Sequence, residues 1–558
     1  MCRQKGGRRV VPLVAAMLAL AWAHPSPAPA ARERQIGAVA APVRLIPDSD
    51  APIAVAGLQS YFGSIELSSA SDGLVVSNHL PLERYLLGLN EVPLDWPRES
   101  LRAQVVAART YALYTLSQPA AGAASVYGFD ICASVQCQVY SGADVFSSSN
   151  GDRWVEAVAS TRGQTVLYGG APILARYHST SGGETLFNSQ AFPGEPDYPY
   201  LRAVSSTTED ASPLYRWYAR FDIEAFEKLL RRAGWWTDDH GQLTSMRTIP
   251  SRAGFHYPDI AIKGRRGTLV RTAEELREVV RTLAPEMFPA RYPSAAPTAS
   301  GRLPETFPSN RIEISTRRGT VFVVGRGWGH GVGMSQWGAH GLALRGASYT
   351  DILAHYYRGT VVGALPDPGA IEVGLDWGRE MAVVSGSFRV VDGRGRTLAR
   401  RALGTWRFRW GGEGIVEVDP PRGFGLPLRV AIVKAPESIG VGEPAYITIA
   451  LSRPARVRTR TAAPTGYDDP GARIEDAGRR RIVWLAPLEP GRYEVQVEAF
   501  TGGALRRSEA VEVDVVQPAV ATRPPRGDEP SRFPWLAVGG FALLCAAALA
   551  ALTGTIRR

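Results

Sequence analysis

The glycine-rich stretch at residues 325–341 constrains the fold more than any other part of this chain, and it reads GRGWGHGVGMSQWGAHG. Glycine permits positive φ and close approach of the backbone to a ligand, at a cost in conformational entropy. Such a density therefore indicates a loop of specific shape. β-branched and aromatic residues at 318–324 predict a strand before it, and apolar spacing over 339–357 predicts a helix after it.

This order of strand, loop and helix also occurs in phosphate-binding sites, but neither a GxGxxG spacing nor a Lys-Ser/Thr pair is found here, which disfavours a nucleotide site. Tryptophan and histidine beside glycine suit a groove in which planar faces contact a sugar-like or polar ligand. The alternative to ligand binding is a purely structural role. In that case the segment is a tight turn whose histidines and tryptophans pack in the core. The residues expected to bind a ligand are Trp328, His330, Ser335, Gln336 and Trp337.

Both ends of the chain carry apolar runs. Residues 1–30 combine a basic start, an apolar stretch at 10–23 and small residues, which predicts a cleaved signal peptide. Residues 535–555 begin with a long uncharged run and predict a transmembrane helix, with 556–558 as a cytoplasmic tail and the bulk of the chain extracytoplasmic. A buried core helix is the alternative for this last run.

Charge and cysteine content narrow the partners. A formal net charge of +10 favours anionic partners, but no nucleic-acid-binding motif is present, so we expect no nucleic acid partner. Cys132 and Cys137 are the two cysteines in the part predicted to be exported, where a short-loop disulfide is the simplest expectation. Because a metal site needs more ligands than two thiols, we expect no cofactor.

The pattern of predicted helices and strands divides the chain into an α+β part and an all-β part. Residues 31–365 mix strand and helix patterns, including a helix that starts near Pro97. Residues 366–435 form a predicted β-rich region, and 436–516 predict a β-sandwich of immunoglobulin-like type. A proline-rich linker follows at 517–534.

Several blocks of residues 61–359, in their order along the chain, resemble the SpoIID/LytB family of bacterial cell-wall proteins, linked to sporulation. The blocks are YFGSIEL, NHLPLERYLLGLNEVPLDWPRESLRAQVVAARTYAL, CQVYSG, YHSTSGGET with PYLRAV, GRGWGHGVGMSQWGAHGLAL and YTDILAHYYRGT. The resemblance implies a SpoIID-like α+β catalytic domain and does not extend to 370–534.

Enzymatic members of that family are lytic transglycosylases, which cut the MurNAc–GlcNAc linkage of glycan strands without stem peptides and leave 1,6-anhydro-muramoyl ends. Their catalytic acid is the glutamate of an E-M/V-P turn, which corresponds here to Glu91, with Val92 where methionine is usual. A single acid must be protonated near neutral pH, so burial should raise its pKa. The positive end of the helix after Pro97, or a nearby Arg109, would oppose this, and an exposed loop carboxylate is the bland alternative.

The resemblance adds weaker expectations for the substrate groove. Arg109 is expected to bind a lactyl carboxylate, with an ion pair to another element as the alternative. Tyr177, His178 and Ser179 precede a Gly-Gly turn and are expected to line the groove. Some members hold zinc through cysteine and histidine, but no histidine lies near Cys132 or Cys137, which disfavours zinc here.

The function predicted from these residues is a membrane-tethered lytic transglycosylase acting on peptidoglycan glycan strands. The alternative is a non-catalytic glycan-binding enhancer of a cell-wall amidase, as the LytB branch is described. A structural scaffold without glycan affinity is the third and most distant hypothesis.

Overall fold

The computed structural model describes residues 35–252, 256–288, 307–462, 471–501 and 504–517. The predicted signal peptide, proline-rich linker and C-terminal transmembrane helix lie outside these residues. Within them, no helix is both long and apolar enough to cross a bilayer.

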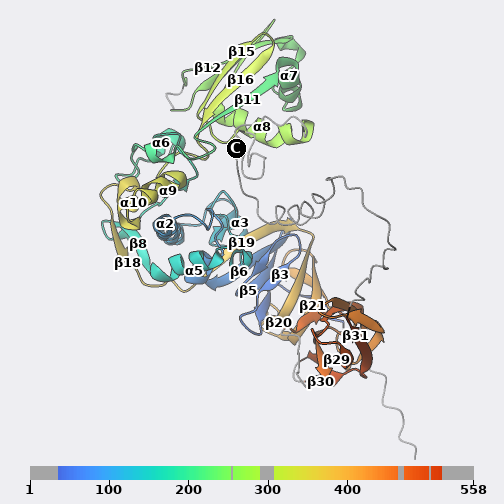
Figure 1. Cartoon of the computed structure of the whole chain (residues 1–558). Coiled ribbons are helices and arrows are strands. Elements are labelled where there is room, and N and C mark those ends of the chain that lie inside the picture. Colours follow the sequence, from blue (N-terminus) through green and yellow to red (C-terminus); the bar gives the residue numbers. More distant parts are fainter. Residues whose placement is uncertain (1–34, 253–255, 289–306, 463–470, 502–503, 518–558) are drawn as a thin grey trace, which may run out of the picture.

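A large, mainly antiparallel sheet forms the base of the molecule (Figure 1), with strand order β1-β22-β21-β20-β2-β5-β6-β19-β7 and β3 and β4 attached beside β20. Inward-facing residues such as Val43, Leu45 and Phe388 are fully buried in it, as expected for strands that cover a core. The bounds are β1 Gly37–Ala40, β2 Val43–Pro47, β3 Ile53–Val55, β4 Ser60–Tyr61, β5 Ser64–Ala70, β6 Gly73–Pro81, β7 Ile131–Cys132, β19 Ala370–Arg379, β20 Met381–Val391, β21 Thr397–Trp410 and β22 Ile415–Asp419.

The base sheet crosses the domain boundary that we predicted at residue 365. Strand β19 pairs with β6, β20 pairs with β2, and β22 pairs with β1. Residues 370–419 are therefore not a separate β-rich region, and they complete a sheet begun at residue 37. The alternation of apolar and polar residues could not predict this pairing. It indicates that a segment is a strand and which face is buried, but not which sheet the strand joins.

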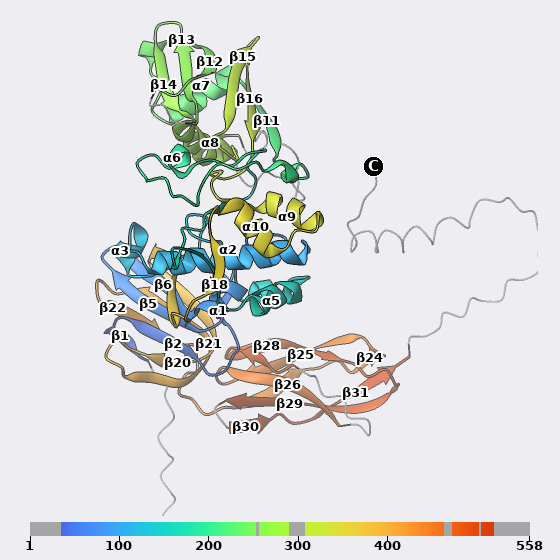
Figure 2. The same cartoon turned by 90° about the vertical axis from the view of Figure 1, so that its left-hand side faces the viewer.

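Helices pack on this sheet, and Figure 2 shows α2 running between the sheet side and a second helical layer. Helix α2 contacts α1 and α5 on one side and α9 and α10 on the other. Pro97 lies directly before α2, so its missing N–H costs no helical hydrogen bond. The bounds are α1 Leu82–Leu87, α2 Arg98–Leu116, α3 Ala123–Tyr127, α4 Asp144–Ser147, α5 Gly151–Ser160, α9 Gln336–Leu344 and α10 Tyr349–Tyr356.

Short strands link these layers. Strand β8 (Gln164–Tyr168) lies between β18 (Val361–Ala364) and β9 (Ala171–Pro172), while β10 (Tyr177–His178) pairs in parallel with β17 (Met334–Ser335). This last pairing joins the YHSTSGG block to the glycine-rich segment.

Residues 216–326 form a lobe at the opposite end from the base sheet (Figures 1 and 2). Two three-stranded sheets and two amphipathic helices enclose their own core, which includes Trp217, Phe226 and Ile262. The bounds are α6 Asn188–Ala191 and η1 Thr207–Glu209 leading into the lobe, then β11 Arg216–Asp222, α7 Ile223–Arg232, η2 Asp238–His240, β12 Leu243–Ile249, β13 Asp259–Gly264, β14 Thr268–Thr272, α8 Ala273–Met287, β15 Ile312–Arg317 and β16 Thr320–Arg326.

The C-terminal β-part consists of two sheets that share one core, with Ile447, Trp484 and Val495 buried in it. A sandwich is thus present, while its likeness to immunoglobulin domains stays a prediction. The bounds are β23 Val430–Lys434, β24 Ser438–Gly440, β25 Pro444–Leu451, β26 Ala455–Ala462, β27 Arg473–Glu475, β28 Gly478–Leu485, β29 Gly491–Thr501, β30 Ala504–Arg507 and β31 Val511–Val516.

Candidate active site

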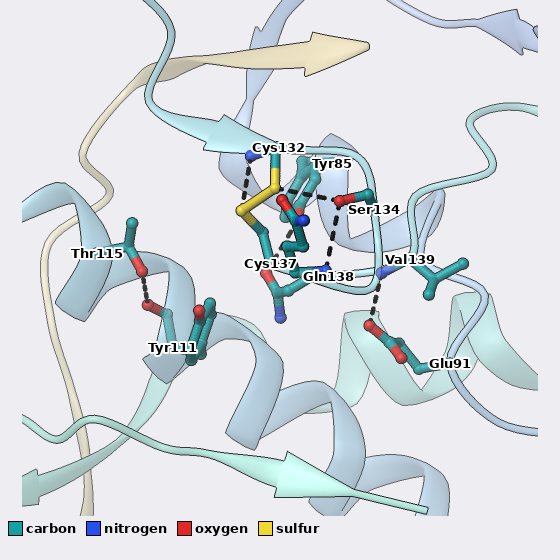
Figure 3. Close-up of a disulfide and its surroundings, with 10 residues drawn as sticks. Tyr85, Glu91, Tyr111, Thr115, Cys132, Ser134, Cys137, Gln138 and Val139 are labelled. Atoms are coloured by element: carbon teal, nitrogen blue, oxygen red, sulfur yellow. Dashed lines mark hydrogen bonds between the residues drawn. A yellow bond between two sulfur atoms is a disulfide. The ribbon is translucent and has the colours of Figure 1, made fainter. Parts of the chain in front are cut away.

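Glu91 lies in the loop between α1 and α2, with its side chain partly buried. The loop is fixed at its start by a bridge between Leu89 and Tyr140. The carboxylate oxygen Oε1 accepts one hydrogen bond from the backbone N–H of Val139 at 2.7 Å and a second from the hydroxyl of Tyr177 at 3.0 Å. Figure 3 shows the Val139 contact beside the disulfide loop. Among the described residues, no group donates a hydrogen bond to Oε2.

Burial raises the pKa of the Glu91 carboxyl from 4.5 to about 7, although the Val139 N–H and the Tyr177 hydroxyl each lower it. Desolvation disfavours the charged form, and here it exceeds the two hydrogen bonds that favour the carboxylate. A substantial fraction of Glu91 is then protonated near neutral pH. A carboxyl whose pKa lies near the pH of its surroundings can both donate a proton and accept it again, so Glu91 can act as a general acid and then as a general base.

A chain of buried hydrogen bonds holds Tyr177 against Glu91. The Tyr85 hydroxyl donates to Gln138 Oε1 at 3.0 Å, and Gln138 Nε2 donates to the Tyr177 hydroxyl at 2.9 Å and to the Ala108 carbonyl at 3.2 Å. Since the Tyr177 oxygen accepts from Gln138, its own proton is directed to Glu91. The network thereby specifies the donor and acceptor at each atom.

Cys132 and Cys137 are joined in a disulfide immediately before Gln138 and Val139 (Figure 3). The bridge closes residues 132–137 into a loop directly before these two residues, so it restricts where they can lie. Both sulfur atoms are consumed, so neither is free to bind zinc. The described residues also contain no cluster of three or more side chains suited to hold a metal ion.

The glycine-rich segment passes close to the strand that carries Tyr177 and His178. At Gly333, with φ of +72°, an added Cβ would lie 2.0 Å from the Arg176 carbonyl oxygen, and at Gly329 it would lie 2.9 Å from the His178 Cβ. Glycine is therefore required for this approach. The approach permits the parallel pairing of β10 with β17.

Glu209 connects the segment that follows Tyr177 and His178 to the glycine-rich segment through hydrogen bonds. Its carboxylate is fully buried and accepts hydrogen bonds from the Ser181 N–H at 3.0 Å, the Ser181 hydroxyl at 2.5 Å and the Gly183 N–H at 2.6 Å. The Ser335 hydroxyl also donates to it. A buried carboxylate with four donors is well satisfied, so Glu209 positions loops rather than contacting a ligand.

Two neutral imidazoles lie beside Tyr177. Burial lowers the pKa of His178 to about 4 and that of His330 well below its usual value. The Val332 carbonyl accepts from His178 Nδ1 at 3.1 Å, which leaves Nε2 as a buried acceptor without a partner among the described residues. The ring centres of His178 and His330 are 5.5 Å apart.

Our prediction that Arg109 binds substrate is wrong. Its side chain is 1% exposed, donates twice to Glu83 at 2.7 and 2.9 Å, and contacts the Gln164 carbonyl. It is the inter-element ion pair that we considered as the alternative. Because this charge is matched by Glu83, it is not available to hold Glu91 in the ionised form.

Other predicted groove residues divide between the surface and the interior. His178, Ser335 and Gln336 are buried. The Ser335 hydroxyl donates to Glu209, and Gln336 Nε2 donates to Gln104 Oε1 at 3.4 Å, so these two donors are already used within the protein. The partly exposed residues are Tyr177, Ser179, Trp328, His330 and Trp337.

The two tryptophans occupy different places. Trp337 packs edge-on against Trp96 of the Glu91 loop, with ring centres 4.9 Å apart, and its backbone N–H donates to the Ser179 carbonyl at 3.0 Å. Trp328 bridges to Thr180 and packs on the core of the 216–326 lobe. Each therefore combines core packing with a partly exposed face.

Sequence reasoning missed four residues that shape the site: Tyr85, Gln138, Val139 and Glu209. Gln138 and Val139 lie in the CQVYSG block and Tyr85 in the NHLPLERYLLG block, so the resemblance pointed to these blocks but not to the individual residues. Val139 acts through its backbone N–H, and such a role cannot be recognised from the type of side chain. Glu209 lies in a plain polar loop, which carries no signal of its buried position.

Comparison with known proteins places part of the chain in a described family. Residues 70–168 match a family model described as SpoIID, stage II sporulation protein. The chain is 30% identical over 305 residues to stage II sporulation protein D of Bacillus amyloliquefaciens, covering 51% of this chain and 75% of that protein. It is 28% identical over 296 residues to the protein of the same name in Bacillus subtilis strain 168, again covering 51% and 75%.

The same region is also similar to the amidase enhancer of Bacillus subtilis strain 168. The two chains are 27% identical over 296 residues, which covers 49% of this chain and 39% of the amidase enhancer. The similarity thus spans less than half of that larger protein.

Proposed function

The chain belongs to the stage II sporulation protein D family, and from that premise we propose that it is a peptidoglycan lytic transglycosylase. Its substrate would be the MurNAc–GlcNAc linkage of glycan strands that lack stem peptides. The observation that carries the proposal is the Glu91 carboxyl, whose pKa is raised to about 7 by burial, beside a tyrosine that donates to it.

One carboxyl is sufficient for this reaction, whereas ordinary glycoside hydrolysis uses two. Glu91 gives its proton to the glycosidic oxygen as the bond from that oxygen to the anomeric carbon breaks. The 6-hydroxyl of the same muramoyl residue then bonds to the anomeric carbon, and its proton returns to the Glu91 carboxylate. The products are a free GlcNAc hydroxyl and a 1,6-anhydro-muramoyl end, and no water is consumed.

Tyr177 and Val139 support each half of this cycle. Their hydrogen bonds to Oε1 stabilise the carboxylate that forms after the first proton transfer. Oε2 is then the oxygen that exchanges the proton with the substrate. The partly exposed Trp337 offers an apolar face for a sugar ring beside the acid.

The test compares Glu91→Gln with wild type on amidase-treated peptidoglycan, with soluble products identified by mass spectrometry. Glu91→Gln should release no anhydro-muramoyl product while remaining folded. Asp95→Asn is a matched control, because Asp95 is an exposed carboxylate in the same loop, and it should retain activity. Equal product release by wild type and Glu91→Gln would refute the assignment.

A second candidate is a non-catalytic enhancer of a cell-wall amidase, favoured by the similarity to the amidase enhancer. This function predicts retention on denuded glycan without soluble products, and faster amidase turnover when the two proteins are mixed. Glu91→Gln would then leave the stimulation unchanged.

We also propose that residues 535–555 tether the protein to the membrane with its bulk outside. Deletion of these residues should move the protein from the membrane fraction to the soluble fraction, and retention in the membrane fraction would contradict the tether.

A further inference from the structure

A cavity of about 630 Å³ lies where the base sheet meets the C-terminal sandwich. Strand β21 contributes one wall and the start of β28 another, while the segment after β22 closes the side. The lining residues are Thr405, Arg407, Pro421, Arg422, Asp476, Ala477, Gly478, Arg479 and Arg480. Its volume is within the range of small-molecule and polymer-segment sites.

The charges around this cavity do not balance. Four arginines face one carboxylate, that of Asp476, and this carboxylate accepts from the backbone N–H and the hydroxyl of Thr405, both at 2.8 Å. Arg480 donates hydrogen bonds to the carbonyl oxygens of Asp476 and Arg479, and its charge also acts on the nearby Glu475 carboxylate, which lies outside the cavity lining. Among the described residues, Arg407, Arg422 and Arg479 have no acidic side chain as a partner.

Arginine stays protonated at any physiological pH, so these charges cannot be relieved by loss of a proton. Arg407, Arg422 and Arg479 are exposed, so water and salt screen part of their mutual repulsion, and an anion that enters the cavity removes the remainder. Guanidinium groups present planar pairs of donors that match the oxygens of a phosphate group. Several such groups around one space suit an anion of more than one charge.

We propose that this cavity binds the phosphate groups of an acidic polymer, separately from the glycan site at Glu91. The Thr405–Asp476 contact joins the two structural units that form the cavity, so the backbone segments that carry the arginines lie at fixed positions. A phosphodiester polymer of the cell envelope would there hold the protein against its substrate. Anionic lipid headgroups carry the same chemistry, and the experiment separates the two sources.

The test uses the full chain and linear polyphosphate as the probe, with titration followed by calorimetry at fixed salt. Arg407→Gln/Arg422→Gln removes two cavity charges and leaves the Thr405–Asp476 contact in place. Arg345→Gln/Arg389→Gln is the matched control, because it removes two exposed arginines that lie outside the cavity. A parallel arm replaces polyphosphate with phosphatidylglycerol–phosphatidylcholine vesicles.

We expect the cavity variant to weaken polyphosphate binding about tenfold or more, since charged hydrogen bonds are lost, and the control to change it less than twofold. Stronger dependence on the cavity arginines for vesicles than for polyphosphate would assign the phosphate chemistry to lipid headgroups. Equal weakening by both variants, or no polyphosphate binding by wild type, would overturn the proposal. Glycan cleavage is measured on the same variants and should be unchanged, so this result is independent of Glu91.

Discussion

Glu91→Gln should stabilise the protein above neutral pH while abolishing its proposed activity. Each pKa unit between the folded and unfolded states corresponds to about 1.4 kcal/mol, so a carboxyl raised from 4.5 to about 7 destabilises the fold by up to about 3 kcal/mol once ionised. Because the side chain is only partly buried, solvent screening reduces this to about 2 kcal/mol. Glutamine keeps an oxygen that can accept from Val139 and Tyr177 but never ionises.

The sign of this effect depends on pH. Below pH 4.5 the carboxyl is protonated in both states, so wild type and Glu91→Gln should be equally stable. Between pH 4.5 and 7 the carboxyl ionises in the unfolded chain but stays protonated in the folded protein, so wild type becomes less stable than Glu91→Gln. Above pH 7 the carboxyl is ionised in both states, and the difference in the free energy of unfolding stays constant.

Calorimetric scans at pH 4.5 and pH 8 measure the difference directly. A 2 kcal/mol gain at pH 8 corresponds to an increase in Tm of about 2–4 °C for a unit of this size. Asp95→Asn, which removes an exposed carboxylate from the same loop, is scanned alongside as the control. A Glu91→Gln variant that is less stable than wild type at pH 8, or equally stable at both pH values, would refute the argument that Glu91 is held neutral by burial.

Three further predictions concern the residues around this acid. Tyr177→Phe removes a donor that favours the carboxylate, so the alkaline limb of the pH–activity profile should move to higher pH and kcat should fall; an unchanged profile would contradict the contact. Arg109→Ala should destabilise the fold by about 3 kcal/mol, because Glu83 is left without its partner, and denaturant unfolding measures this; Arg109→Ala protein that remains folded should give the same glycan products as wild type. Glu209→Gln should cost about 2 kcal/mol and raise KM more than it lowers kcat, whereas loss of kcat alone would assign Glu209 a direct chemical role.

The sequence allowed the acid, its tyrosine and the disulfide to be singled out on different grounds. Glu91 was identified through the resemblance of its E-V-P turn to the family's turn, and Tyr177 through its place before the Gly-Gly turn of another matching block. The disulfide was expected because two cysteines lie in the part predicted to be exported. The structure joins Glu91 and Tyr177 by a hydrogen bond and brings the disulfide loop to the same carboxylate.

The sequence could not predict which side chains and strands contact one another when they lie far apart along the chain. Whether Arg109 meets a ligand or Glu83 depends on where α1 lies against α2, and helical spacing contains no such information. The same holds for Glu209, whose donors come from two segments that glycines allow to touch. Strands β19–β22 were assigned to the wrong structural unit because the alternation of apolar and polar residues does not identify the strand with which each one pairs.

The base sheet begins with strands near the amino end and is completed by β20–β22, which the ribosome makes much later. Synthesis from the amino end therefore leaves β1 without its partner β22, and β2 with β5 but without β20, until residue 419 has been made. Such delayed closure slows folding and leaves open strand edges that invite aggregation. A chain that stops before residue 419 is therefore expected to keep these edges exposed.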